Sequence, residues 1–128
     1  MRKTLSLLLM LLVSLSIFAG SKGKIAFEAT RYDFGYIEES KGVVAHDFEF
    51  TNTGKGALII IDTRSMCGCT ASKYSREPIA PGKKGSINVT FDPEGRPGAF
   101  RKEIKVYTSA GKSPVKLIVE GVVVPKKQ

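Results

Sequence analysis

The two cysteines of this chain lie two residues apart, as Cys67-Gly68-Cys69 within the segment Ser65–Thr70. On an extended backbone, side chains at this spacing point to the same side, so both sulfur atoms can face one small target. Gly68 lets the backbone bend between them. Three chemical states follow from this arrangement: a disulfide, a pair of free thiols, or a chelate that holds a metal ion with two sulfur ligands.

The metal hypothesis favours copper. Two thiolates form a soft site that suits Cu(I), which accepts low coordination numbers. Met66 adds a thioether, and His46 adds an imidazole from an earlier segment. Zinc normally takes four ligands, more than these residues supply. Cys67 and Cys69 are therefore candidate Cu(I) ligands, with His46 and Met66 as nearby donors.

The other two states are equally concrete. Cysteines of exported proteins meet oxidising conditions and usually pair. A disulfide between Cys67 and Cys69 must draw together Cα atoms that lie about 7 Å apart on an extended chain, which would make the bond easy to reduce. In the remaining state both thiols are inert packing groups, His46 is a hydrogen-bonded core residue, and Met66 fills a gap in the packing. The sequence leaves the three states open.

Catalysis has little support in the sequence. Either cysteine could pair with His46, but no third residue is placed to orient such a pair, and no segment forms an oxyanion hole. The acidic residues are scattered over outward strand positions, and no phosphate-binding loop occurs. We expect no catalytic residues, no enzyme activity and no cofactor apart from the copper alternative.

The elements that position these residues are predicted to be strands. Apolar and polar residues alternate, with breaks at Gly, Pro, Asn or Asp about every ten residues, which predicts an all-β domain. About seven strands in this length indicate an immunoglobulin-like β-sandwich. The predicted strands are 25–27, 32–37, 44–52, 57–66, 85–92, 100–108 and 115–124. The side chains expected to be buried are Val44, Phe48, Phe50, Ile87, Val89, Phe91, Ile104 and Leu117.

These strands predict how the cysteines are held. The chain is expected to reach them as the strand Ala57–Met66 and to leave them as an irregular connection that includes residues 72–81. The turn Asn52–Gly56 contains two glycines, so we expect Val44–Asn52 to pair antiparallel with Ala57–Met66.

That hairpin sets the position of His46. Counting back from the turn places His46 opposite Asp62 or Thr63, beside the cysteine loop but outside bonding distance of its sulfur atoms. The run Ala57–Asp62 lacks alternation, which predicts a strand covered on both faces.

Residues 1–19 have the pattern of a secretory signal peptide. Arg2 and Lys3 give a positive start, and Leu5–Ala19 is almost uninterruptedly apolar. The apolar segment is shorter than the roughly 20 residues that a membrane-spanning helix prefers, so we expect cleavage near Ala19 rather than an anchor. The sequence predicts one domain over residues 20–128 that is exported, periplasmic or secreted, and not stably inserted in a membrane.

The charge of the exported part is moderately basic. Removal of Arg2 and Lys3 leaves 18 of the 20 basic residues against 12 acidic ones. They occur as scattered pairs without interleaved aromatic residues, so we expect no nucleic-acid partner. The expected partner of a monomeric module is a protein or a component of the cell envelope. The opening strands between Ile25 and Tyr36 are the sheet edges expected to bind it.

Several motifs together resemble a known family. They are Tyr32-Asp33-Phe34-Gly35, His46–Gly54, Cys67-Gly68-Cys69-Thr70, Pro78–Gly85 and Gly95–Phe100. In this combination the chain resembles domain-of-unknown-function family 1573, which occurs in exported bacterial proteins. The resemblance covers essentially the whole exported part. It implies an immunoglobulin-like fold and a compartment, and it implies no biochemical activity.

Two further resemblances imply functions. The hairpin Phe48–Gly54 is similar to a segment of major-sperm-protein-like and cilium-associated immunoglobulin-like domains, which bind proteins. The motif Cys67-Gly68-Cys69 followed by Pro81-Gly82 is similar in order to the copper-delivery factor that assembles cytochrome c oxidase, although the aromatic residues flanking its cysteines are absent here. The first implies an exported, non-enzymatic binding or adaptor module. The alternative is a periplasmic Cu(I)-binding or copper-delivery protein.

Overall fold

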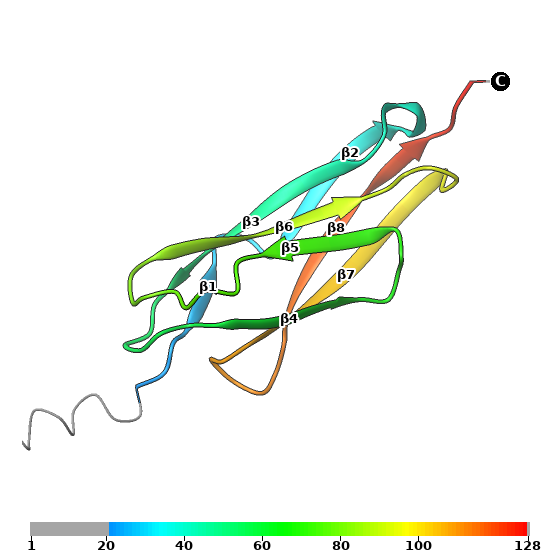
Figure 1. Cartoon of the computed structure of the whole chain (residues 1–128). Helices are drawn as coiled ribbons and strands as arrows, with labels where there is room; N and C mark the ends of the chain where they lie inside the picture. Colours follow the sequence, from blue (N-terminus) through cyan, green and yellow to red (C-terminus); the bar gives the residue numbers. More distant parts are fainter. Residues whose placement is uncertain (1–20, 128) are drawn as a thin grey trace, which may run out of the picture.

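A computed structural model describes residues 21–127, which form a sandwich of eight strands and one short 3-10 helix (Figure 1). The elements are β1 (Ile25–Phe27), β2 (Arg31–Glu38), η1 (Glu39–Lys41), β3 (Val44–Asn52), β4 (Ile60–Ser65), β5 (Thr70–Tyr74), β6 (Lys84–Phe91), β7 (Gly98–Thr108) and β8 (Val115–Val124). The expected signal peptide, residues 1–19, lies outside the described residues. Within residues 21–127 no helix is long and apolar enough to cross a membrane.

The strands form two four-stranded sheets, ordered β1-β3-β6-β5 and β2-β8-β7-β4. Neighbouring strands are antiparallel, except that β2 runs parallel to β8. The chain passes from one sheet to the other at most of its connections, so strands that follow one another in sequence often lie on opposite layers (Figure 1). The prediction of an all-β, immunoglobulin-like sandwich is confirmed.

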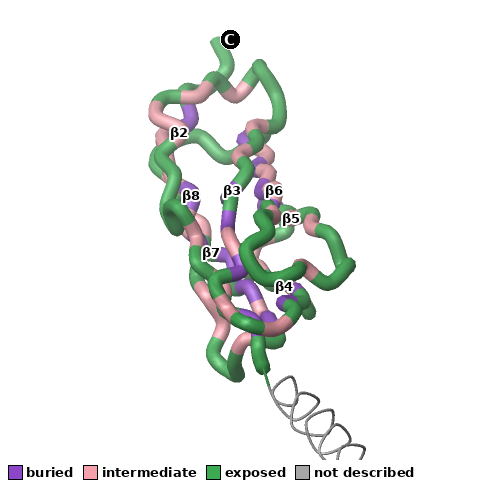
Figure 2. The backbone as a smooth tube through the Cα atoms, turned by 90° about the vertical axis from the view of Figure 1, so that its left-hand side faces the viewer, coloured by how far each residue is buried: buried purple, intermediate pink, exposed green. Residues whose placement is uncertain are grey.

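The core lies between the two sheets, where buried positions alternate with exposed ones along each strand (Figure 2). Burial of each such side chain stabilises the fold by about 1.5–3 kcal/mol relative to the exposed state. The side chains predicted to be core are buried, except that Val44 is only partly buried near one end. Most of the buried side chains form one cluster of Phe48, Phe50, Leu58, Ile60, Ile87, Val89, Ile104, Val106, Leu117 and Val119, and Cys69, Phe91 and Val123 form a second.

The predicted hairpin between β3 and β4 is wrong. β3 pairs with β1 and β6, whereas β4 pairs with β7 in the opposite sheet. The connection between them changes layers: Leu58 still forms an isolated bridge with Ile79, ahead of β6, whereas Ile60 begins β4 in the opposite sheet, and both side chains are buried in the core. β4 is also not covered on both faces, since Ile59 and Ile61 are exposed. It is an edge strand with apolar residues on both of its faces.

The chain leaves the cysteines as a strand, not as the irregular connection that we expected. β5 starts at Thr70 and pairs antiparallel with β6. Its less exposed positions are Thr70, Ser72 and Tyr74, which are too polar to give a clear apolar alternation. The Ser72 hydroxyl is hydrogen-bonded to Thr63 of β4, so this contact ties the edges of the two sheets together.

A single buried amide organises the end of β3. Asn52 is 0% exposed. Its Oδ1 accepts hydrogen bonds from the amides of Lys24 and Gly54, at 3.1 and 3.0 Å. Its Nδ2 donates to the carbonyl oxygens of Gly56 and Ile79, both at 2.8 Å. This side chain supplies the hydrogen bonds that hold three separate loops to one strand end.

Candidate functional site

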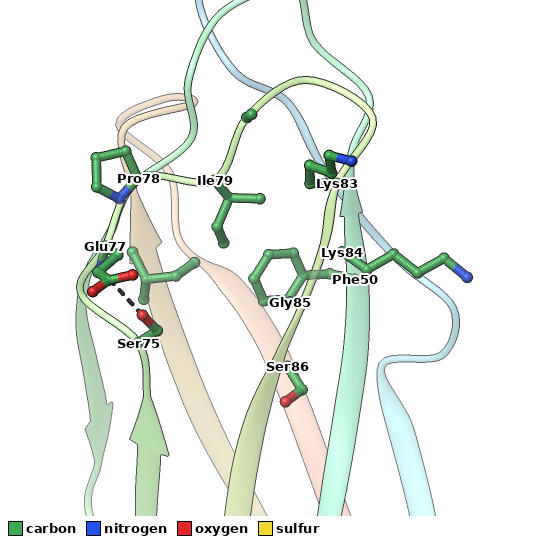
Figure 3. Close-up of a pocket in the computed structure, with 11 residues that line it drawn as sticks. Phe50, Ser75, Glu77, Pro78, Ile79, Lys83, Lys84, Gly85 and Ser86 are labelled. Carbon is green, nitrogen blue, oxygen red and sulfur yellow. Dashed lines mark hydrogen bonds between the residues drawn. The ribbon is translucent and has the colours of Figure 1, made fainter.

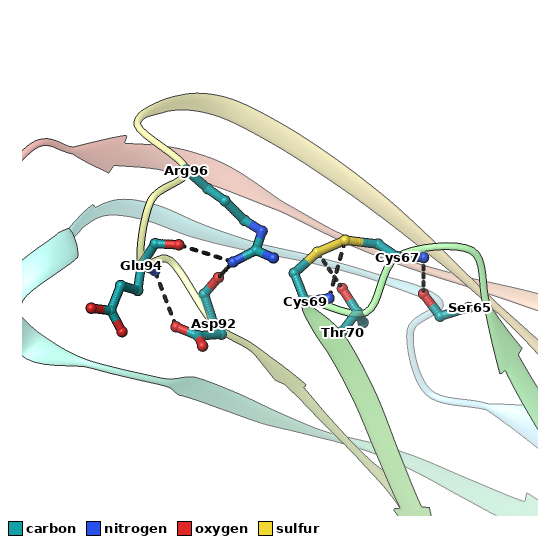
Figure 4. The surroundings of a disulfide bond; sticks show 7 residues. All are labelled: Ser65, Cys67, Cys69, Thr70, Asp92, Glu94 and Arg96. Atoms are coloured by element: carbon teal, nitrogen blue, oxygen red, sulfur yellow. Dashed lines mark hydrogen bonds between the residues drawn. A yellow bond between two sulfur atoms is a disulfide. The ribbon is translucent and has the colours of Figure 1, made fainter.

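The loop Met66–Cys69 connects β4 to β5, and Cys67 and Cys69 are joined there by a disulfide (Figure 4). Their Cα atoms lie 5.2 Å apart, inside the usual range for a disulfide and shorter than the extended spacing. Gly68 is exposed, and no atom would lie within 4 Å of a Cβ added to it. The loop therefore closes on itself without burying its tip. While the two sulfurs are bonded to each other, neither is a thiolate ligand.

The two sulfur-bearing residues differ in exposure. Cys69 is 4% exposed and belongs to a small cluster with Phe91 and Val123. Cys67 is only partly buried and packs against the outside of this cluster. Met66 is fully exposed. A reactant that approaches from solvent therefore meets the Cys67 side of the bond first.

Backbone hydrogen bonds hold the loop in this form. The Cys69 amide donates to Sγ of Cys67 at 3.2 Å, and the Thr70 amide donates to the Cys67 carbonyl oxygen at 3.2 Å. The Thr70 hydroxyl lies 3.6 Å from Sγ of Cys69. The Asp92 amide donates to the Cys69 carbonyl oxygen at 2.9 Å. The sulfur of Cys67 therefore accepts a hydrogen bond from a backbone amide, and the sulfur of Cys69 lies near a hydroxyl group.

His46 lies in a different part of the sandwich from the predicted one. It pairs with Val89 of β6, so the position expected opposite Asp62 or Thr63 is wrong. β6 separates it from β5 and the cysteine loop. Its ring stacks on Tyr32 at 3.6 Å, and burial lowers the pKa of the imidazole, against a smaller opposing effect of Asp47. Among the described residues no group of three or more His, Cys, Asp or Glu side chains could hold a metal ion.

A basic groove of about 640 Å³ runs beside Cys67, over the end of β4 and the adjoining part of β7. Arg101, Lys102 and Lys105 form no ion pair within residues 21–127. Two further charges of the groove are neutralised, Arg64 by Asp62 at 3.1 Å and Glu103 by Lys116 at 3.7 Å. The groove is lined by Arg64, Ser65, Met66, Cys67, Arg101, Lys102, Glu103, Lys105 and Tyr107.

Sequence reasoning missed this groove. Arg101 and Lys102 are one of the scattered basic pairs of the sequence, and strand alternation sends their side chains to opposite faces. They meet beside Cys67 because β4 ends at Ser65, opposite Ile104, while β7 continues beyond it. The missing signal was therefore the pairing of β4 with β7, which the sequence did not reveal.

The loop between β6 and β7 borders the disulfide on another side. Arg96 extends towards the cysteines and donates to the carbonyl oxygens of Asp92 and Glu94, at 3.4 and 2.9 Å (Figure 4). Glu39 of η1 accepts hydrogen bonds from the amides of Gly95 and Lys126, which lower the pKa of its carboxyl group. These contacts fix the β6–β7 loop beside the cysteine loop.

A second hollow, of about 360 Å³, lies near the opposite end of the sandwich (Figure 3). Phe50 and Ile79 face each other across it. Gly85 is needed there because a Cβ would lie 2.6 Å from the Phe50 ring. The apolar part of its wall belongs to the packing of the β5–β6 connection, and Glu77, Lys83 and Lys84 also line it.

The family comparison gives one match. The model of the family described as protein of unknown function (DUF1573) matches residues 25–123. The matched segment runs from the first residue of β1 nearly to the end of β8. No curated protein matches the chain.

Solved structures share the fold. A protein of unknown function from Porphyromonas gingivalis W83 is 16% identical, with a TM-score of 0.67 over 78% of this chain and 46% of that one. The ASH/PapD-like domain 7 of human CEP192 is 12% identical, with a TM-score of 0.67 over 81% and 87%. The secreted serine protease VesC from Vibrio cholerae is 14% identical, with a TM-score of 0.59 over 77% and 23%. The chain thus spans about half of the first protein and about a quarter of the protease.

Proposed function

We propose that this chain, which belongs to the DUF1573 family of proteins of unknown function, is an exported, non-enzymatic binding module that pairs an open sheet edge with an extended segment of a partner protein. One observation carries the proposal: the unpaired side of β3 between Val44 and Phe48. A free strand edge presents a row of backbone N–H and C=O groups, and another chain can add to it as a further strand.

This edge is open because β1 is short. β1 pairs only with Phe50–Asn52, and the Glu28 amide adds one hydrogen bond to Glu49 at 3.0 Å. From Val44 to Phe48 that side of β3 has no strand partner among residues 21–127. The other side of β3 pairs with β6 over eight consecutive residues without a register shift. The open segment is therefore straight and regular.

The other sheet edges are less suited to pairing. β2 has a register shift after Asp33, and β4 has one after Ile60. Such bulges twist an edge away from a second chain. β5 has five residues and carries Lys73, a residue type that discourages edge pairing. Val44–Phe48 contains neither bulge, proline nor lysine.

Exposed apolar and aromatic groups border the open edge. Val43, directly before β3, is 59% exposed, and Tyr32 of β2 is 38% exposed where its ring stacks on His46. The outer face of β3 instead carries Asp47 and Glu49. A partner strand with apolar residues on its inner face would match Val43 and Tyr32, and polar residues on its outer face would match Asp47 and Glu49.

Photocrosslinking at matched alanines tests this function. Ala45 on β3 and Ala71 on β5 are both exposed and both pair with Thr90, from opposite sides of β6. Benzoylphenylalanine at position 45, introduced into the chain in its native envelope, should crosslink to a protein partner. The same group at position 71 should not. The partner should also slow amide hydrogen exchange across Val44–Phe48.

Two results would contradict this proposal. One is equal crosslinking from both positions, which would indicate random neighbours. The other is an identified partner that leaves hydrogen exchange of Val44–Phe48 unchanged, since strand addition necessarily engages those backbone groups.

Cu(I) carriage by the reduced cysteines is the alternative function. It is supported by the closeness of Cys67 and Cys69, whose Cα atoms are 5.2 Å apart, with the exposed Met66 beside them. Titration of the reduced protein with Cu(I) against a competing chelator should show tight binding that is lost in Cys67→Ser/Cys69→Ser and kept in His46→Ala. Binding no tighter than that of two unrelated surface thiols would exclude this function.

A further inference from the structure

We propose that the Cys67–Cys69 disulfide is a redox site that exchanges with a dithiol carried on an acidic segment of a partner protein. This proposal does not rest on the proposed binding edge: the cysteine loop leads into β5 at one edge of the sheet β1-β3-β6-β5, whereas the open side of β3 faces away from β6 and β5. The argument rests on the unequal exposure of the two cysteines, on the hydrogen bonds to their sulfurs, and on the basic groove beside Cys67.

Exposure decides which sulfur is attacked. Thiol–disulfide exchange needs a thiolate to approach one sulfur along the line of the bond that breaks. Cys69 is 4% exposed within its apolar cluster, whereas Cys67 is open towards the groove. The incoming thiolate therefore bonds to Cys67, and Cys69 is the leaving group.

Hydrogen-bond donors are placed for the charges that exchange creates. The Thr70 hydroxyl, 3.6 Å from Sγ of Cys69, can donate to that sulfur when it leaves as a thiolate. The Cys69 amide already donates to Sγ of Cys67 at 3.2 Å and would do the same for a Cys67 thiolate in the reduced loop. Donors to the charged form favour a thiolate over a thiol.

The groove selects for negative charge. Arg101, Lys102 and Lys105 face it without an ion-pair partner among the described residues, and the one carboxylate that lines it, Glu103, is paired with Lys116. A positive surface attracts an incoming thiolate and the acidic residues around it, and it raises the rate of encounter.

The reaction balances as a two-electron exchange. A thiolate of the partner attacks Sγ of Cys67, the bond between the two protein sulfurs breaks, and its electron pair leaves on Cys69. The second thiolate of the partner then attacks its own sulfur in the mixed disulfide and releases Cys67. The partner dithiol becomes a disulfide, the loop becomes a dithiol, and the two protons of the partner thiols end on Cys67 and Cys69.

The rate of reduction by matched peptides tests the charge preference. The oxidised protein is mixed with a two-cysteine peptide flanked by aspartates, or with the same peptide flanked by lysines, and the protein thiols are counted by alkylation and mass spectrometry. The acidic peptide should react about tenfold faster at low salt, and the difference should shrink as salt screens the charges. Equal rates for the two peptides would overturn the proposal.

Matched variants locate the effect in the groove. Arg101→Gln/Lys105→Gln should remove most of the advantage of the acidic peptide. Lys83→Gln/Lys112→Gln changes the net charge equally at the other end of the sandwich, and both side chains are exposed there. This control should keep the advantage. An equal loss in both double variants would show that net charge alone is responsible.

Trapping compares the accessibility of the two sulfurs, on which the order of attack depends. A single-cysteine acidic peptide activated as a mixed disulfide should couple to Cys67 in Cys69→Ser at least about ten times faster than to Cys69 in Cys67→Ser, because burial limits access to Cys69. Native-like circular dichroism of both variants shows that they are folded. Equal coupling rates, or faster coupling at Cys69, would contradict the assigned order of attack.

Discussion

A buried amide lowers stability unless each of its polar atoms has a partner. The Asn52 side chain meets this condition, because its oxygen accepts two hydrogen bonds and its nitrogen donates two. Its own backbone amide and carbonyl oxygen are paired with Lys83 and Gly82. At the scale of the residue, the Asn52 side chain holds the connections at this end of the sandwich by hydrogen bonds. Elsewhere, backbone hydrogen bonds between strands have this role.

Asn52→Ala should therefore destabilise the fold by about 3 kcal/mol, since it removes four hydrogen bonds of a fully buried side chain and leaves the Lys24 and Gly54 amides and the Gly56 carbonyl oxygen without this partner. Chemical denaturation measures the change. Asn88→Ala is the control: Asn88 bonds Asp47 at 2.7 Å on the exposed outer face of the sheet, and its loss should change stability by less than about 0.5 kcal/mol. Equal losses would mean that burial of the amide does not set the cost.

His46 makes the stability depend on pH. Burial lowers the pKa of the folded imidazole, so the unfolded chain takes up the proton first as the pH falls below about 6.5. Stability is then lost on acidification and levels off below the folded pKa. His46 is the single histidine of the chain, so His46→Gln should flatten the profile between about pH 7 and pH 5. Denaturation of the parent and of His46→Gln across this pH range measures the effect. Parallel profiles of stability against pH would contradict this prediction.

At the residue scale the sequence anticipated part of the site. The spacing of Cys67 and Cys69 indicated that the two sulfurs could meet, and the structure joins them. The alternation of β3 turned His46 inward, as expected. The sequence could not show that Cys69 is far more buried than Cys67, because that difference comes from Phe91 and Val123 on other strands.

At the scale of the element, β2 is bent where it passes β8. The register shifts between Asp33 and Tyr36, the backbone of Gly35 takes a φ of 69°, and the Asp33 carboxylate accepts the Gly35 amide at 2.7 Å. Across the sheet, a Cβ at Gly121 would lie 2.8 Å from the Gly35 carbonyl oxygen and 2.9 Å from the Phe100 ring. The bulge brings the two strands too close for any side chain at position 121.

Gly121→Ala should accordingly cost about 1–3 kcal/mol of stability, the usual result of forcing a methyl group into packed atoms. Gly68→Ala is the matched control because its Cβ would meet nothing within 4 Å, and it should stay within about 0.5 kcal/mol of the parent. Thermal and denaturant unfolding of the two variants provide the comparison. A Gly121→Ala variant as stable as the parent would mean that the bulge moves to make room for the methyl group.

The strands themselves were largely predictable, and their partners were not. Period-two alternation found β3, β6, β7 and β8. Pro81 and Gly82 form a turn before β6, in which the Lys83 amide donates to the Ala80 carbonyl oxygen at 3.1 Å. Alternation says which face of a strand is buried but not which sheet it joins. A short connection such as Asn52–Gly56 serves a hairpin and a change of layer equally well, which is why the pairing of β4 was wrong.

At the scale of the whole molecule, export stays a prediction, because residues 1–19 lie outside the described part. The positive start and the apolar segment Leu5–Ala19 lead us to expect a mature chain that begins within a residue or two of Ala19. N-terminal sequencing of the exported protein measures this. Leu9→Arg should interrupt the apolar segment and leave the chain unprocessed inside the cell. An intact Met1 start in the membrane fraction of the parent would contradict the prediction.

The parallel pairing of β2 with β8 has a mechanical consequence. β2 is reached early in the chain and β8 is its last strand, and six residue pairs join them side by side between Arg31 and Glu38. Because the two strands are parallel, the first residue of β2 and the last residue of β8 lie at opposite poles of the sandwich. Tension applied between those poles first detaches β1, which has only three residues. It then pulls β2 and β8 past one another in shear.

In shear, the hydrogen bonds between the two strands share the load and must fail together, whereas strands that peel apart lose theirs one at a time. Resistance to pulling is a matter of how fast the domain yields rather than of its equilibrium stability. A module tethered at one pole and loaded at the other would thus hold under forces that a hairpin of the same length would not bear.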